Sequence, residues 1–246
     1  MEKIKIHGVM MDNVTMDEAL EYVIGRLDRT GTAKLYTPNS EIMMQAQRDP
    51  ELKDILNQAD LLIADGAGVV LASRILERPL KEKVSGVDLV ERILEYTNNR
   101  PASFFIFGAR PGVAEKAAEN IMTQYPKAQI RGWRHGYFNS DEEDTIIDSI
   151  NESGADILLV GLGAPKQEKW IHKNAHRLNC KVAMGIGGSI DVLAGTATLA
   201  PEFMRRAGLE WLFRLVKEPR RLPRMMDLPR FILLSVKRRF RPKKDS

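Results

Sequence analysis

The sequence predicts an α/β fold with a Rossmann-like, mostly parallel sheet and helices on both of its faces. Short apolar runs bounded by glycine alternate with segments of helical period, which is the pattern of βαβ units. Polar or glycine-rich clusters directly follow nearly every apolar run, as expected at the carboxyl ends of parallel strands. With 246 residues, of which 43% are hydrophobic, the chain can bury one sizeable core and a small appendage.

The apolar runs place the elements in chain order. Thr15 followed by Glu18 has the spacing of a capping box, so a first helix is expected to begin there. After a short start at residues 4–9, the predicted strands cover residues 33–37, 61–64, 103–107, 129–132, 156–160 and 181–185. The predicted helices cover residues 41–48, 51–58, 68–76, 88–96, 113–125, 142–152 and 167–178. The alternation amounts to six to seven βα units.

Charge divides the chain near residue 195. Residues 203–246 contain 14 Lys/Arg and four Asp/Glu, a net charge of +10, so the preceding 202 residues carry −6 of the total +4. We therefore expect a Rossmann-like catalytic domain at residues 1–195 and a basic helical appendage at residues 196–246. A tail of this charge suits an anionic partner, whether phospholipid headgroups, a diphosphate or nucleic acid.

The appendage is predicted to be helical over residues 203–217 and again over residues 231–240. Pro219, Pro223 and Pro229 are expected to break the chain between them, because proline cannot donate a hydrogen bond inside a helix. The last helix interleaves apolar residues with Lys and Arg, which suits an anionic bilayer surface. Few aromatic residues accompany these charges for base stacking, so no nucleic-acid partner is expected.

The predicted location is the cytoplasm, at the inner face of the cell membrane. No apolar run approaches the roughly 18 residues of a spanning helix, and the N-terminus lacks the apolar stretch of a signal peptide. The single cysteine, Cys180, excludes an intramolecular disulfide.

The clusters after the strands should converge on one ligand crevice, because the carboxyl ends of parallel strands share one edge of the sheet. These clusters contain Thr37 and Asn39, Asp65, Gly108, Tyr137, Lys166 and Gln167, and Asp191. Glycine turns at helix N-termini let backbone amides approach phosphate oxygens, which favours a nucleotide diphosphate as the ligand. A complete G-x-G-x-x-G fingerprint does not accompany the Gly161-Leu-Gly163 turn.

Asp65 is the carboxylate that we select as the candidate catalytic residue, since it follows an apolar run and begins a glycine turn. It can serve as a general base, or as an N-cap for the helix after Gly66. Asp191 occupies an analogous place, where it would either contact a sugar hydroxyl or cap a helix. Thr37, Asn39 and Gln167 can hydrogen-bond sugar hydroxyls without adding charge.

Neither a metal nor a cofactor is expected. The sequence contains no Asp-x-Asp motif of the kind that clamps a metal-bound diphosphate, and His172 with His176 lacks a third ligand motif. The negative charge of a leaving diphosphate would therefore be stabilised by cations of the tail, since guanidinium groups bind phosphate in bidentate fashion. These cations are Arg214, Lys217, Arg220, Arg221 and Arg224.

The motifs together resemble the WecG/TagA/CpsF family of bacterial glycosyltransferases over nearly the whole chain. The resemblance is carried by Thr37-Pro-Asn-Ser-Glu-Ile42, Ala64-Asp-Gly66, Gly161-Leu-Gly-Ala-Pro-Lys-Gln-Glu168, Gly187-Gly-Ser-Ile-Asp191, Gly208-Leu-Glu-Trp-Leu-Phe-Arg214 and Lys217-Glu-Pro219. It implies transfer of N-acetylmannosamine or a related hexose from a UDP-sugar to undecaprenyl-diphosphate-linked N-acetylglucosamine. The pathway implied is the synthesis of wall teichoic acid or a related surface polysaccharide.

The resemblance also assigns residue roles. Asp65 would be the catalytic base, acting in a single, metal-independent, inverting displacement. The residues implied to bind substrate are Thr37, Asn39, Lys83, Gly108, Tyr137, Lys166, Gln167, Asp191, Arg214, Arg221 and Arg224. Lys83 stands where related sequences carry arginine, and lysine cannot reproduce the arginine fork. An equilibrium between a homo-oligomer and an active, membrane-bound monomer is implied as well.

Two other classes of function stay open at this level. A nucleotide-dependent oxidoreductase would use a similar sheet, but it normally carries the full glycine fingerprint with an acidic residue about 20 positions later. A non-catalytic membrane-surface adaptor would need Asp65 only as a helix cap. Bound NAD would favour the first class, and activity retained in an Asp65→Asn variant would favour the second.

Overall fold

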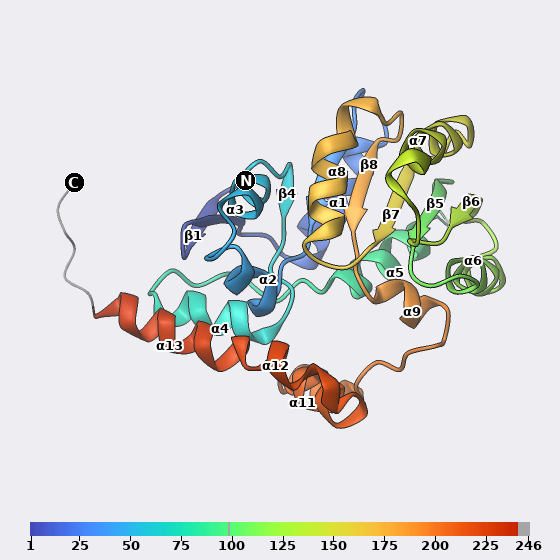
Figure 1. Ribbon diagram of the computed structural model, residues 1–246. Coiled ribbons are helices and arrows are strands. Elements are labelled where there is room, and N and C mark those ends of the chain that lie inside the picture. The colour runs from blue at the N-terminus through green and yellow to red at the C-terminus, as the bar shows by residue number, and fades with distance from the viewer. Residues whose placement is uncertain (98, 241–246) are drawn as a thin grey trace.

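The computed structural model describes residues 1–97 and 99–240, and of Arg221 it describes the backbone alone. Six parallel strands form the central sheet in the order β4-β3-β8-β7-β5-β6 (Figure 1). They are β3 (Ala33–Tyr36), β4 (Leu61–Leu62), β5 (Ser103–Gly108), β6 (Gln129–Arg134), β7 (Ile157–Gly161) and β8 (Val182–Gly185). The predicted fold class is therefore confirmed.

Helices cover both faces of this sheet, and alternate strand residues point into two separate cores. In β3, Leu35 faces one core and Tyr36 faces the other, and in β5 Ile106 and Phe107 divide in the same way. One face carries α2 (Ser40–Gln45), α3 (Pro50–Asn57), α4 (Ala67–Ile75), α7 (Glu143–Glu152) and α8 (Lys166–Asn174). The other carries α1 (Met16–Arg26), α5 (Gly86–Tyr96), α6 (Val113–Gln124) and α9 (Ser189–Leu193).

The N-terminus differs from the expected short start at residues 4–9. It forms an antiparallel hairpin of β1 (Lys3–Ile6) and β2 (Val9–Asp12), separate from the main sheet. His7 and Gly8 make the turn with φ of 51° and 86°, the left-handed geometry that two-residue hairpins require. The predicted capping box of Thr15 and Glu18 is confirmed at the start of α1.

The appendage departs from its prediction at two places. The helix expected over 203–217 is divided into α10 (Glu202–Arg206) and α11 (Glu210–Lys217), because Gly208 adopts a φ of 72° between them. After η3 (Pro219–Arg221) and α12 (Leu222–Met225), the helix α13 (Asp227–Arg239) begins before Pro229 rather than after it. Proline is tolerated there, since the N–H groups of the first turn have no partner inside the helix.

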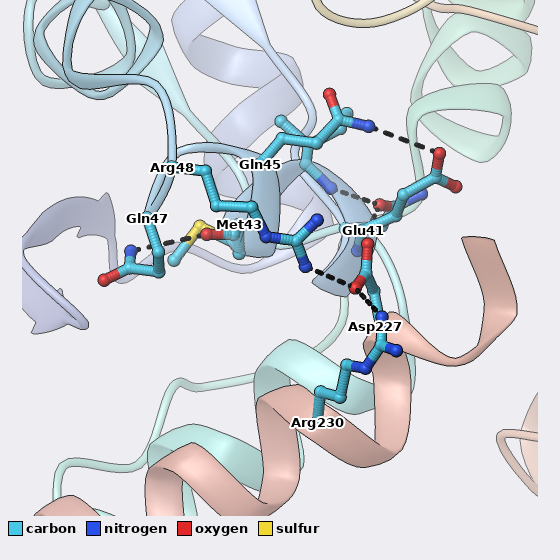
Figure 2. A network of polar contacts seen from close by, with 9 residues as sticks. Glu41, Met43, Gln45, Gln47, Arg48, Asp227 and Arg230 are labelled. Atoms are coloured by element: carbon cyan, nitrogen blue, oxygen red, sulfur yellow. Dashed lines mark hydrogen bonds and ion pairs between the residues drawn. The ribbon is translucent and has the colours of Figure 1, made fainter. Parts of the chain in front are cut away.

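Helix α13 packs along α2 and α4 (Figure 1). Its Phe231 is fully buried in the core below. Asp227 at its start accepts from Arg48 at 2.6 Å and lies within 3.3 Å of Arg230, so one carboxylate joins α13 to the end of α2 (Figure 2). At the middle of the helix, Ser235 forms a 2.7 Å hydrogen bond with His7 of the hairpin turn. Among the described residues, no helix is long and apolar enough to cross a membrane.

Candidate active site

Asp65 lies just beyond β4, where the chain turns into α4. Gly66 adopts a φ of 101° and is itself the N-cap of α4, so the alternative that Asp65 caps this helix is wrong. The backbone amide of Asp65 donates to the Pro38 carbonyl, which holds the β4 turn against the β3 turn. The Asp65 carboxylate instead accepts from the Gly86 amide at 3.4 Å, which is a long contact.

The surroundings of Asp65 raise the pKa of its carboxyl to about 6. Burial is the largest cause, and the nearby carboxylate of Glu210 adds to it. Arg214, the Gly86 amide and Lys83 act in the opposite direction. A carboxylate with this pKa is largely ionised at neutral pH and still basic enough to take a proton from a hydroxyl.

A pocket of about 900 Å³ opens beside Asp65, between the sheet edge and the appendage. The predicted site residues among its walls are Asn39, Asp65, Lys83, Arg214 and Arg224. The first three come from the body and the two arginines from α11 and α12, so the appendage completes the enclosure. Its volume falls within the range of small-molecule sites.

Asn39 and Thr37 follow β3 and have structural partners. The Asn39 side-chain oxygen accepts from the Glu41 and Ile42 amides and caps α2, while the residue still lines the pocket. Thr37 is buried, and its hydroxyl donates to the Gly185 carbonyl at 3.2 Å. Thr37 therefore ties β3 to the end of β8.

Gln167 is buried at the first turn of α8. Its Oε1 accepts from the Gly187 amide at 3.0 Å, and its Nε2 donates to Glu168 at 2.9 Å. The side chain of Gln167 thus fixes the glycine loop after β8, and Thr37 is bonded to Gly185 at the end of that strand. Neither Thr37 nor Gln167 lines the pocket beside Asp65, so the structure does not bring all the predicted residues into one pocket.

Gly108 ends β5 beside the Gly161 turn that ends β7. A Cβ on Gly108 would lie 2.4 Å from the Gly161 carbonyl oxygen, so only glycine allows the two turns to approach this closely. The chain leaves β5 toward β6 and leaves β7 toward β8, in opposite directions along the sheet. Such a switch point is where open α/β sheets hold their ligands.

Three further predicted residues follow the central and outer strands. The Lys166 ammonium lies 4.5 Å from the centre of the Phe138 ring, and the neighbouring Tyr137 is 64% exposed. Asp191 lies in the first turn of α9, whose N-cap is Gly188, so it does not cap this helix. Its backbone carbonyl accepts from the Thr196 hydroxyl, which shapes the turn after α9. The side chain of Arg221 lies outside the described part of the structure.

The wall of the pocket also contains charged residues that were not predicted from the sequence, among them Glu210 and Arg205. Glu210 contacts Arg214 at 2.6 Å and Lys83 at 4.0 Å, and Arg205 contacts Asp88 of α5 at 3.0 Å. The i, i+4 spacing of Glu210 and Arg214 on one predicted helix is the signal that identifies the first of these pairs. The contacts of Glu210 with Lys83 and of Arg205 with Asp88 join residues more than 100 positions apart, so no local sequence pattern predicts them.

Comparison with known proteins gives a consistent result. The model of the glycosyl transferase WecG/TagA/CpsF family matches residues 4–245. The chain is 35% identical over 211 residues to a protein of Bacillus spizizenii, covering 86% of this chain and 81% of the relative. It is 33% identical over 244 residues to a protein of Staphylococcus aureus, covering 98% and 95%. Both relatives are N-acetylglucosaminyldiphosphoundecaprenol N-acetyl-beta-D-mannosaminyltransferases, so the resemblance found in the motifs is confirmed.

Proposed function

The chain belongs to the WecG/TagA/CpsF family of glycosyltransferases, and we propose that it moves N-acetylmannosamine or a related hexose from a UDP-sugar to undecaprenyl-diphosphate-linked N-acetylglucosamine. The names of its relatives support the sugar and the acceptor. The product belongs to wall teichoic acid or a related surface polysaccharide.

One observation carries the mechanism: a carboxylate with a raised pKa lies in a pocket whose walls bear Lys83, Arg214 and Arg224. Asp65 takes the proton of the acceptor hydroxyl as that oxygen attacks the anomeric carbon of the donor. The bond from the anomeric carbon to the diphosphate breaks, and UDP leaves with the bonding electrons. The three cations stabilise the departing negative charge without a metal ion. A single displacement of this kind inverts the anomeric configuration.

The donor nucleotide is proposed to lie toward the glycine turns at the ends of β5, β7 and β8. Gly108 would let the backbone approach the nucleotide, with Tyr137, Lys166 and Asp191 around it. Thr37 and Gln167 would support the sugar from the end of β8 and the loop after it, to which they are hydrogen-bonded. Asn39 would face the acceptor side of the pocket. Arg221 is proposed to join Arg214 and Arg224 at the diphosphate.

The appendage, residues 196–246, is proposed to bind the anionic inner face of the cell membrane, where a polyprenyl-linked acceptor resides. Phe203, Val216, Leu233 and Phe240 support this, since each exposes 69–79% of its surface among many Lys and Arg residues. The acceptor lipid would then enter the pocket from the bilayer side. A homo-oligomer in solution stays a prediction.

The test measures UDP release from UDP-N-acetylmannosamine with a lipid-linked N-acetylglucosaminyl diphosphate acceptor, in EDTA. We expect acceptor-dependent release by the wild type and a loss of about 100-fold or more in Asp65→Asn. Asp141→Asn, at an exposed position far along the chain, is the matched control and should keep wild-type activity. Wild-type rates in Asp65→Asn would exclude Asp65 as the base, and activity abolished by EDTA would exclude the metal-free mechanism.

A further inference from the structure

Glu210, the first residue of α11, bridges the appendage and the body. Its Oε1 lies 2.6 Å from the Arg214 guanidinium one turn along the same helix, and its Oε2 lies 4.0 Å from the Lys83 ammonium of the body. The Glu210 side chain is only 22% exposed. One carboxylate therefore occupies two of the cations that line the pocket.

The position of Glu210 is electrostatically unfavourable for a neighbour of a catalytic carboxylate. Its negative charge acts on Asp65, and it would also repel a negatively charged ligand entering the same pocket. In this position Glu210 pairs with the cations Lys83 and Arg214. Phosphate oxygens of a ligand would compete with the Glu210 carboxylate for the same N–H donors.

We propose that Glu210 is an internal counterion, which occupies Lys83 and Arg214 in the empty enzyme and is displaced when a nucleoside diphosphate binds. The inference rests on the proposed function, in which these two cations bind the donor diphosphate. A phosphate group then replaces the carboxylate as the bridge between α11 and the body. Glu210 thereby lowers the affinity for the nucleotide and keeps the cations from being left unpaired when the pocket is empty.

The experiment measures UDP binding to the full chain by calorimetry at fixed ionic strength. We expect Glu210→Gln to bind UDP about three- to tenfold more tightly than the wild type, because the competing charge is removed. Glu210→Asp keeps the charge and should bind within about twofold of the wild type. Glu119→Gln is the matched control, since Glu119 forms a surface i, i+3 pair with Lys116 on α6 and does not line the pocket, and its affinity for UDP should not change.

The outcomes separate this inference from the proposed function. Weaker or unchanged UDP binding in Glu210→Gln would overturn the counterion role, and weaker binding would identify Glu210 as a tether for α11. Lys83→Ala and Arg214→Ala should both weaken binding. If neither does, or if the wild type does not bind UDP, the placement of the diphosphate fails and the inference fails with it. Thermal unfolding of each variant, followed by circular dichroism, checks that the fold is kept.

Discussion

Helices α11 and α13 both bring the appendage against the body, but they do so by different means. On α13, Phe231 and Ser235 are fully buried and Asp227 is nearly so. On α11, none of the described side chains is buried, and the contacts with the body include a charged pair across the pocket. Local opening costs least where few apolar contacts must break. The appendage thus has an anchored end at α13, while α11, which carries Arg214, buries no described side chain and is proposed to exchange its charged contact for a ligand.

The largest expected effect is a loss of stability where α13 is anchored to the core. Phe231→Ala should lower the free energy of unfolding by about 3–4 kcal/mol, because it leaves a cavity where α13 meets the core. Phe240→Ala is the matched control on the same helix, and since Phe240 is 79% exposed it should change the value by less than about 0.5 kcal/mol. Urea unfolding measures both. Equal effects of the two variants would show that α13 is not anchored through Phe231.

A second prediction uses the hairpin contact of α13. Burial, together with the charges of Arg238 and Lys53, lowers the pKa of His7 to about 4 from an ordinary value of 6.5. Between these two values the unfolded chain binds more protons than the folded one, so stability falls as the pH is lowered from 6.5 to 4. The loss should reach about 2 kcal/mol.

His7→Asn is the comparison for this loss, because asparagine tolerates the positive φ of the turn but does not titrate. Urea unfolding of both proteins at several pH values gives the measurement. If the difference between wild type and His7→Asn is the same at pH 4.5 and pH 7, the folded protein does not hold His7 neutral.

The pocket beside α11 should respond to pH in the opposite sense. The pKa of Asp65 is raised from 3.8 to about 6, so between these values the folded chain binds more protons than the unfolded one. The charged carboxylate therefore costs stability, increasingly as the pH rises from 3.8 to 6, and Asp65→Asn should stabilise the fold by about 1–3 kcal/mol at pH 7 while lowering transfer by about 100-fold or more. Wild-type transfer should fall as the pH drops through about 6, because Asp65, the proposed base, becomes protonated. A stabilisation that is absent at pH 7 would contradict the raised pKa.

Much of the body follows from the sequence, and the reasons are physical. Strands buried on both faces are continuous apolar runs, so β5 and β7 lie within one residue of their predicted bounds. Asp65 was identified because polar residues after such runs end at the carboxyl edge of the sheet. The order of the strands has no local signal, and it is this order that puts Asp65 and Asn39 in the pocket while Thr37 and Gln167 support the loop after β8.

The appendage shows most clearly which contacts cannot be predicted from the sequence. His7 and Ser235 are 228 positions apart, and neither residue type suggests the other as a partner. Charge composition identified the tail as a distinct region, but it treated the tail as one basic surface. The difference between α13 and α11 depends on which apolar side chains meet the body, and both helices combine apolar residues with Lys and Arg.

The smallest expected change in stability falls on α11 itself. Arg214→Gln should alter the free energy of unfolding by less than about 0.5 kcal/mol, because its pair with Glu210 lies at the surface and its side chain is 44% exposed. The same substitution should weaken UDP binding several-fold, since Arg214 is proposed to donate to the diphosphate in bidentate fashion. Arg92→Gln, which breaks surface pairs of an arginine with similar exposure on α5 outside the pocket, should leave both quantities nearly unchanged. A large loss of stability in Arg214→Gln would place α11 with α13 as a structural anchor, and the division of the appendage into an anchored and an exchangeable part would then be wrong.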